Sequence, residues 1–462
     1  MANSSEISLK PSEISKYREK IINGPIIRTL FWLGTPPLVN QLVIVAYNVA
    51  DSYWLSKYNE IAVAVPRQMW PILVLFQAVA NALTTASLSL ISQYVGSKAY
   101  KEAGLSASRF FTLTLLSGGA LSILLLTFRH LIFTIIMSTP IEIFDYVIDY
   151  SGIIAFDIFF NYIALTYTTF LQSVGDTTRP AIVNVISVSI NIILDPFFVL
   201  GIGPFPRLGV VGAALTDVIG KIISIIALAY ILRNKYPEIK IGFTKNISIK
   251  WARLVLRIGL PVLALGLMNG FAFLMQLKFV NMIGIVAATA FSIGFIIIDA
   301  VDAALWGLSG APAIMIGQSL GAGNSKRARE VALKATLLIF ILVAIGAAIA
   351  YPMRRSIADV FADNKNILDE TDIFLQTILL TLPFFSLFSI ALSIGRGSGH
   401  TLFPTILGIF RLWGFRITLG YILAFILGMG SMGIWVSIAI SNLIGIIAII
   451  WIKYGKWAKA II

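Results

Sequence analysis

The chain of 462 residues contains no cysteine and only two histidines, His130 and His400. A chain without cysteine cannot form a disulfide, a thiolate nucleophile or a cysteine-ligated metal site. Two isolated histidines are too few for most zinc centres, and the HExxH motif of zinc proteases is absent. No set of nucleophile, base and orienting residue stands out, so the sequence argues against an enzyme and predicts no cofactor.

Charged residues are also scarce. They make up 12% of the chain, hydrophobic residues make up 58%, and the mean hydropathy is +0.89. A soluble protein of this size could not hide so much apolar side chain, so most of the chain is expected to lie in lipid. The apolar runs are long and continuous, which favours transmembrane helices over the alternating strands of a barrel. The polar segment 1–25 contains no cleavable signal pattern.

Twelve apolar segments appear when the chain is divided at its charge clusters and at glycine and proline. They lie near 27–56, 61–94, 104–128, 147–172, 179–203, 208–232, 251–281, 285–319, 331–352, 371–395, 402–428 and 431–452. A helix needs roughly 20 apolar residues to cross a bilayer. The sequence therefore predicts an all-α integral membrane protein with 12 transmembrane helices.

The distribution of basic residues predicts the orientation in the membrane. With the N-terminus inside, 24 of the 35 Lys and Arg residues fall in segments on the inner side and seven fall outside. Cytoplasmic loops of membrane proteins carry such an excess. We therefore expect a multi-pass protein of the plasma membrane with both termini in the cytoplasm. The net charge of +13 is then a topology signal and requires no nucleic-acid partner.

The second half of the chain repeats the first at a nearly constant offset. The matching pairs are Gly34/Gly259, Pro36/Pro261, Gln93/Gln318, Gly96/Gly321, Lys101/Lys326, Ala103/Ala328, Gly175/Gly399, Pro180/Pro404 and Gly209/Gly433. Six helices in each half make the repeat parallel, with its axis along the membrane normal. Two pseudo-symmetric six-helix bundles around a central cleft are the architecture of a transporter.

The repeat divides the chain into four parts. We expect a cytoplasmic N-terminal segment (1–26), an N-terminal bundle (27–232), a basic cytoplasmic linker (233–250) and a C-terminal bundle (251–462).

Taken together, these spans and repeated motifs resemble the MATE (multidrug and toxic compound extrusion) family. The resemblance implies an antiporter that exports amphipathic, often cationic, organic compounds while H⁺ or Na⁺ enters. It also implies that Asp51 and the Asn191/Asp195 pair correspond to the coupling site in the N-terminal bundle, as in the DinF-like branch. The NorM-like branch uses acids on helices 7 and 10. Here helix 7 has Gln276, and segment 371–395 has only Asp372.

Polar residues on helices 1 and 5 support the same site. Two trios share a spacing of seven and four residues: Asn40, Tyr47 and Asp51, and Asn184, Asn191 and Asp195. Each trio falls within roughly 40° on one helix face. A carboxylate without a cationic partner in a low dielectric is easily protonated, and carboxylate and amide oxygens also suit a hard cation such as Na⁺. Asn161 and Thr216 could supply further ligands. The alternative is that both aspartates only make structural hydrogen bonds.

The remaining charges within the spans are interpreted mainly as structural. Asp217 precedes Lys221 by four residues, which is the spacing of a helical ion pair. Asp157 could belong to the coupling network or only complete a polar face. In the second half, the depths of four charges match pairwise. They predict the buried pairs Asp299–Arg416 and Asp302–Arg411, or alternatively a gate lining the cleft.

Two consecutive prolines, Pro36 and Pro37, lie near the start of helix 1. Proline removes a backbone hydrogen bond, so helix 1 could bend here when Asp51 is protonated. The alternative is that the prolines only mark the start of the helix.

The sequence therefore predicts a secondary active multidrug exporter, expected to be monomeric, that carries small amphipathic or cationic compounds across the bilayer. A flippase for lipid-linked precursors is the alternative, and its cleft would need clustered positive charge for a pyrophosphate. A passive channel, which would need a pore ring from repeated subunits, fits a pseudo-dimer poorly.

Overall fold

The computed structural model describes residues 12–237, 239–362 and 364–462, and these residues contain helices but no strand. The first half comprises α1 (Glu13–Asn23), α2 (Ile26–Tyr58), η1 (Glu60–Val63), α3 (Ala64–Gly96), α4 (Tyr100–Leu131), η2 (Ile132–Ile136), α5 (Ile141–Val174), α6 (Thr178–Leu200) and α7 (Val210–Lys235).

The second half begins with three long helices and continues with shorter ones. They are α8 (Ile249–Ile283), α9 (Ile285–Gly321), α10 (Ser325–Asp359), α11 (Lys365–Leu379), α12 (Leu382–Ser398), α13 (Leu402–Ile409), η3 (Phe410–Leu419), η4 (Ile422–Ile426), α14 (Ser431–Asn442) and α15 (Gly445–Tyr454).

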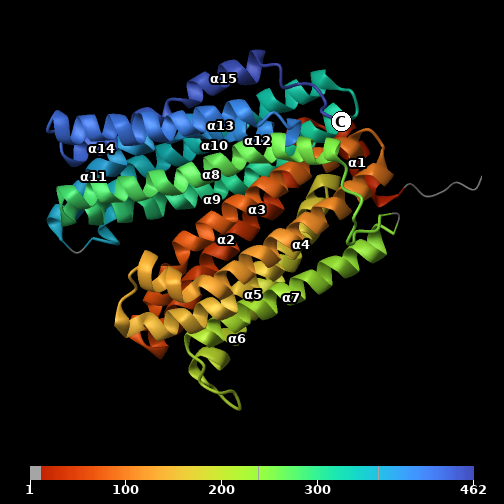
Figure 1. Ribbon diagram of the computed structural model, residues 1–462. Helices are drawn as coiled ribbons and strands as arrows, with labels where there is room; N and C mark the ends of the chain where they lie inside the picture. The colour runs from red at the N-terminus through yellow and green to blue at the C-terminus, as the bar shows by residue number, and fades with distance from the viewer. Residues whose placement is uncertain (1–11, 238, 363) are drawn as a thin grey trace, which may run out of the picture.

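The helices form two bundles, α2–α7 and α8–α15, that meet at one end of the molecule (Figure 1). Helices α2 and α3 of the first bundle pack against α8 and α9 of the second. The bundles lie close together near α1 and the C-terminus and diverge toward the opposite end. We call the first of these the basic end, which carries α1, residues 239–248 and residues 455–462, and the second the far end.

Ten helices in the described residues are long and apolar enough to cross a membrane, and eleven if the bent pair α11 and α12 counts as one span. Helix α5 has 34 residues but is not among them. It carries four acids, namely Glu142, Asp145, Asp149 and Asp157. The all-helical membrane fold is confirmed, whereas the count of twelve spans stays a prediction.

Segment 371–395, predicted as one transmembrane span, is divided between two helices. Helices α11 and α12 meet at an angle of 54° around residues 380–381. Pro383 lies in the first turn of α12 and cannot donate the backbone hydrogen bond that would continue α11. By contrast, α2 continues through Pro36 and Pro37 as one helix, so a bend linked to Asp51 stays a prediction.

The repeated glutamines join the two bundles at the basic end. Gln93 of α3 donates from Nε2 to the carbonyl oxygens of Gly397 and Ser398, both at 3.2 Å, at the end of α12. Gln318 of α9 donates to the carbonyl oxygen of Ser173, at 2.9 Å, at the end of α5. Each glutamine thus reaches into the opposite bundle, and the two contacts occupy equivalent positions of the repeat.

The repeated glycines allow this contact. A Cβ on Gly96 would collide with the backbone carbonyl of Gln318, and a Cβ on Gly321 would collide with that of Gln93. Small residues let helix backbones approach closely within a membrane. The Gln-x-x-Gly repeat is therefore the place where α3 and α9 cross.

Helix α1 and the C-terminal residues cover this crossing. Arg18 of α1 donates from Nε to the Gly96 carbonyl oxygen at 2.8 Å, and Arg327 of α10 donates to the carbonyl oxygen of Ile21 at 2.7 Å. The backbone N–H of Ile461 donates to Gln93 Oε1 at 2.9 Å. Contacts from both bundles therefore hold α1 and the C-terminus against the crossing.

A buried polar cluster fixes the start of α6 beside α1. Arg179 donates to Asp176 at 2.8 Å and to Glu13 of α1 at 3.0 Å, and the Tyr236 hydroxyl donates to Asp176 at 2.8 Å. Burial and the adjacent Asp176 carboxylate raise the pKa of the Tyr236 hydroxyl. Tyr236 therefore remains a proton donor at neutral pH.

Substituting Gly96 with alanine should loosen the basic end. The added methyl group must push α3 away from α9, and overpacking of this kind costs about 1–3 kcal/mol. We expect a lower midpoint of thermal unfolding for Gly96→Ala and for Gly321→Ala in detergent. Gly346→Ala in α10 is the matched control, because a Cβ there meets nothing within 4 Å. Equal midpoints for all three variants would contradict the close crossing.

Candidate functional site

Four aspartates from four helices gather inside the first bundle. They are Asp51 of α2, Asp157 of α5, Asp195 of α6 and Asp217 of α7, and we call them the acidic cluster. Asp51 interacts electrostatically with Asp195 and with Asp217, and Asp157 interacts with Asp217. Asp195 is fully buried. The sequence predicted the pairing of Asp51 with Asp195 at one level, and the structure brings them close.

Thr216 and Asn191 hold two of these acids in place. The Thr216 hydroxyl donates to Asp195 Oδ1 at 2.6 Å. Asn191 Nδ2 donates to Asp217 Oδ1 at 3.2 Å. Helix α7 has Gly220 beside Asn191, and a Cβ there would collide with the Asn191 side chain. The absence of a side chain at Gly220 thus lets α6 place Asn191 against α7.

Asp217 belongs to this network, contrary to the sequence interpretation. The Tyr47 hydroxyl of α2 donates to Asp217 Oδ1 at 2.6 Å. The expected helical ion pair with Lys221 is absent from the salt bridges of the described residues, so that prediction is wrong. Lys221 instead interacts at longer range with both Asp157 and Asp217. The i, i+4 spacing places two side chains on one face but cannot show that Tyr47 competes for the carboxylate.

The cluster has more hydrogen-bond acceptors than donors. Three buried oxygens of the cluster have no partner among the described residues, namely Asp51 Oδ1, Asp157 Oδ1 and Asp195 Oδ2, and neither has Oδ1 of the neighbouring Asn191. A buried acceptor without a donor costs about 1–3 kcal/mol. A proton, or a hard cation such as Na⁺ bound through oxygen atoms, would satisfy such groups. No group of three or more acidic or histidine side chains in the described parts is placed to hold a metal ion.

Two predicted ligands, Asn184 and Asn161, make no hydrogen bond to the cluster in the described residues. Asn184 donates to Asn40 of α2, two turns along α6 from Asn191, which is roughly 10 Å at 1.5 Å per residue. Asn161 lies one turn beyond Asp157 on α5 and makes no side-chain hydrogen bond within the described segments. Polar residues on one face of a helix therefore need not all bind the same ion.

The two buried ion pairs predicted for the second bundle are wrong. Neither Asp299–Arg416 nor Asp302–Arg411 is among the salt bridges of the described chain. Asp299 is exposed, and Arg416 donates to the Ser441 hydroxyl at 3.0 Å. Asp302 interacts with both arginines only at longer range.

The reason lies in the helix that carries the arginines. Arg411 and Arg416 lie on η3, which is a π-helix. Its wider turns rotate side chains away from the positions that an α-helical rise predicts. The match in depth predicted where each charged residue lies along its helix, but it could not predict toward which neighbour the side chain points.

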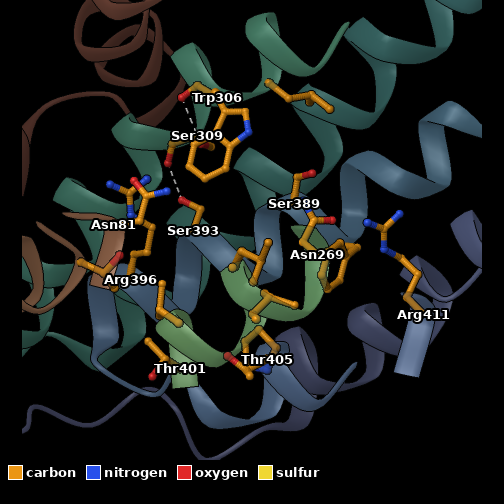
Figure 2. Close-up of a pocket in the computed structure, with 18 of the residues that line it drawn as sticks. Asn81, Asn269, Trp306, Ser309, Ser389, Ser393, Arg396, Thr401, Thr405 and Arg411 are labelled. Atoms are coloured by element: carbon orange, nitrogen blue, oxygen red, sulfur yellow. Dashed lines mark hydrogen bonds between the residues drawn. The ribbon is translucent and has the colours of Figure 1, made fainter. Parts of the chain in front are cut away.

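A cavity of about 250 Å³ lies inside the second bundle, beside α3 (Figure 2). Its polar lining comes from α3, α8, α9, α12, α13 and η3, and consists of Asn81, Thr85, Asn269, Asp302, Ser309, Ser389, Ser393, Arg396, Thr401, Thr405 and Arg411. Trp306 and several apolar side chains complete the wall. The position of Arg396 near the end of an apolar run resembles that of a loop charge. Only the fold shows that Arg396 lines the cavity.

A family model described as MatE matches residues 36–197 and again residues 261–422. The chain belongs to the MATE family. The two matches begin at the equivalent prolines Pro36 and Pro261 and are equally long, which confirms the internal repeat. MATE proteins of this kind are multidrug efflux transporters, so this chain is an integral membrane transporter rather than an enzyme.

Named relatives cover most of the chain. The probable multidrug resistance protein YoeA of Bacillus subtilis is 25% identical over 86% of this chain and 87% of its own length. A protein named FAD transporter from Shewanella oneidensis is 27% identical over 71% of this chain and 72% of its own length. An outward-facing MATE transporter structure superposes with a TM-score of 0.87, at 21% identity, over 96% of this chain and 98% of that chain.

Removing the positive charge of Lys221 should make stability depend on pH. Without Lys221, ionised Asp157 and Asp217 face each other uncompensated, and breaking a buried charge interaction costs up to about 3–5 kcal/mol. We expect Lys221→Met to unfold at a lower temperature than the native protein at pH 8. At pH 5, where the acids can be protonated, the difference should shrink.

The double variant Lys221→Met/Asp157→Asn provides the control. It removes one of the two repelling acids and should recover part of the loss at pH 8. A Lys221→Met variant that is destabilised equally at both pH values would show that Lys221 does not compensate the cluster.

Proposed function

We propose that this MATE transporter exports organic compounds by antiport, and that H⁺ or Na⁺ drives export through the acidic cluster of the first bundle. The observation that carries the proposal is the set of buried cluster oxygens without donors. These oxygens belong to Asp51, Asp195 and Asp157, the neighbouring Asn191 adds one more, and a single lysine interacts with the cluster. Such a site takes up a positive charge readily and releases it when water enters.

Coupling requires the occupied and empty cluster to favour different arrangements of the helices. Asp51, Asp195 and Asp217 lie on α2, α6 and α7, and Tyr47 joins α2 to α7 through Asp217. Helix α2 also packs against α9 of the other bundle. A cation that draws the acids together would therefore act on the helix that borders the second bundle. The basic end, which we assign to the cytoplasm from its charge, is the closed end here.

The absence of acids from the equivalent position in the second bundle supports a site in the first bundle alone. Gln276 stands where Asp51 stands in the first copy, and Gln276 is buried. Asp372 lies 3.0 Å from Arg354 near the far end, so a cation already neutralises it. These features favour the DinF-like arrangement over the NorM-like one.

A flippase for an anionic lipid-linked precursor is the second candidate. The observation in its favour is the presence of Arg396 and Arg411 in one cavity. Relatives of this chain are named for multidrug resistance and for FAD transport, so the family does not fix the charge of the transported compound.

Transport in proteoliposomes tests the proposal. Dye movement is measured under an imposed pH gradient and under an imposed Na⁺ gradient, for the native protein and for Asp51→Asn. We expect one of the two gradients to drive transport by the native protein. Asp51→Asn should lose at least about tenfold of that rate, because the amide cannot exchange a proton and binds a cation weakly.

Asp299→Asn is the matched control, because it neutralises an acid of the second bundle outside the cavity lining. It should keep the driven rate. If Asp51→Asn transports like the native protein while Asp299→Asn does not, coupling belongs to the second bundle.

A further inference from the structure

Arg396 is a half-buried positive charge without an ion-pair partner among the described residues. It lines the cavity from the last turns of α12, and its side chain forms no ion pair in the described residues. Its Nε is buried and has no hydrogen-bond acceptor there. The guanidinium lies 5.9 Å from the centre of the Trp306 ring. Arginine cannot lose its proton in a protein, so this charge is permanent.

Arg411 repeats the pattern from the other side of the cavity. Figure 2 shows Arg396 and Arg411 on opposite sides of the lining. Arg411 is 7% exposed, and both Nε and Nη1 lack a partner in the described part of the chain. Its guanidinium lies 4.8 Å and 5.1 Å from the ring centres of Phe385 and Phe388. Stacking on rings leaves the edge N–H groups of a guanidinium free to bind an acceptor.

Among the described residues, the cavity lining has one acid to balance two arginines. Asp302 interacts at longer range with Arg411 and also with Arg416, which lies outside the cavity, and no carboxylate of the described segments interacts with Arg396. A buried charge without a partner is costly, so it persists where a ligand supplies the opposite charge. The side chains of Asn269 and Ser389 lie between the two arginines in Figure 2 and offer neutral hydrogen bonds.

We propose that this cavity binds the anionic group of an aromatic or amphipathic substrate, a carboxylate or a phosphate, through Arg396, with the apolar part against Trp306, and that Arg411 adds positive charge from the opposite side. The volume of about 250 Å³ is near the lower end of small-molecule sites, roughly 300–1,000 Å³. It therefore accommodates one charged group and one ring rather than a whole large molecule. The proposal rests on the transport function proposed above and specifies the charge of what is carried.

Equilibrium binding tests the charge preference without any ion gradient. Two probes share one benzene ring and differ in charge: 4-phenylbutyrate and 4-phenylbutyl-trimethylammonium. Their dissociation constants are measured by isothermal titration calorimetry with the purified full chain in nanodiscs of zwitterionic lipid. The native protein should bind the anionic probe at least about tenfold more tightly than the cationic one, which corresponds to one charge-assisted hydrogen bond.

Substitutions of Arg396 identify the residue responsible. Arg396→Gln should weaken binding of the anionic probe by about tenfold and leave the cationic probe unchanged. Arg396→Lys keeps the charge but loses the two-pronged geometry, so it should give a smaller loss. Arg253→Gln, which removes an exposed charge from α8 outside the cavity, is the matched control and should change neither constant.

Tighter binding of the cationic probe by the native protein, or equal binding of the anionic probe by Arg396→Gln and native protein, would overturn the proposal. If Arg396→Gln does not fold, Arg396→Lys decides in the same way. Asp51→Asn should bind the anionic probe like the native protein. The experiments can therefore contradict the proposed ion coupling and the proposed anion binding independently of each other.

Lipid and free anions are distinguished by adding phosphatidylglycerol to the nanodiscs. If phosphatidylglycerol competes with the anionic probe in the native protein but not in Arg396→Gln, the occupant is a lipid phosphate. Probe binding that phosphatidylglycerol does not reduce identifies a free organic anion. Both outcomes support recognition of an anion by Arg396.

Discussion

The close crossing of α3 and α9 is the contact on which the arrangement of the two bundles depends. Gly96 and Gly321 let the two backbones touch, and Gln93 and Gln318 each hydrogen-bond to a helix end in the opposite bundle. Because the bundles diverge from this point, its integrity determines which end of the molecule is open (Figure 1). The ion coupling that we propose therefore requires the acidic cluster to weaken or strengthen this contact.

Charge is divided between the bundles in a way that the repeat makes visible. In the repeat, Asp51 corresponds to Gln276, Gln172 corresponds to Arg396, and Ser187 corresponds to Arg411. Each of these three charged residues thus has a neutral polar counterpart in the other copy. The first bundle has become acidic inside and the second has gained arginines, while the backbone crossing has kept its symmetry. We infer that duplication supplied the scaffold and that the two interiors then specialised for different tasks.

Sequence reasoning succeeded where a pattern extends over many residues. Hydropathy predicted the helical membrane fold, and a constant offset between motifs predicted the repeat that the family match confirms. The level of Asp51 and Asp195 followed from helical rise alone. The predicted side-chain contacts were wrong where they depend on which way a side chain points around its helix rather than on its depth in the membrane. The π-helical turns of η3 rotated Arg411 and Arg416, and Tyr47 reached Asp217 from another helix. Arg396 was missed because its position near a helix end resembles that of a loop charge.

We propose that occupancy of the acidic cluster controls the contact between the bundles at the basic end. Because the chain has no cysteine, two introduced cysteines can carry the only spin labels. Ser97 and Lys326 are exposed residues that flank the crossing on opposite bundles. The distance between labels at these sites is measured by pulsed electron resonance at pH 8, at pH 5 and with Na⁺. We expect acid or Na⁺ to shift the distance distribution in the native background and Asp51→Asn to abolish this shift. A shift that persists unchanged in Asp51→Asn would contradict control of the crossing by the acidic cluster.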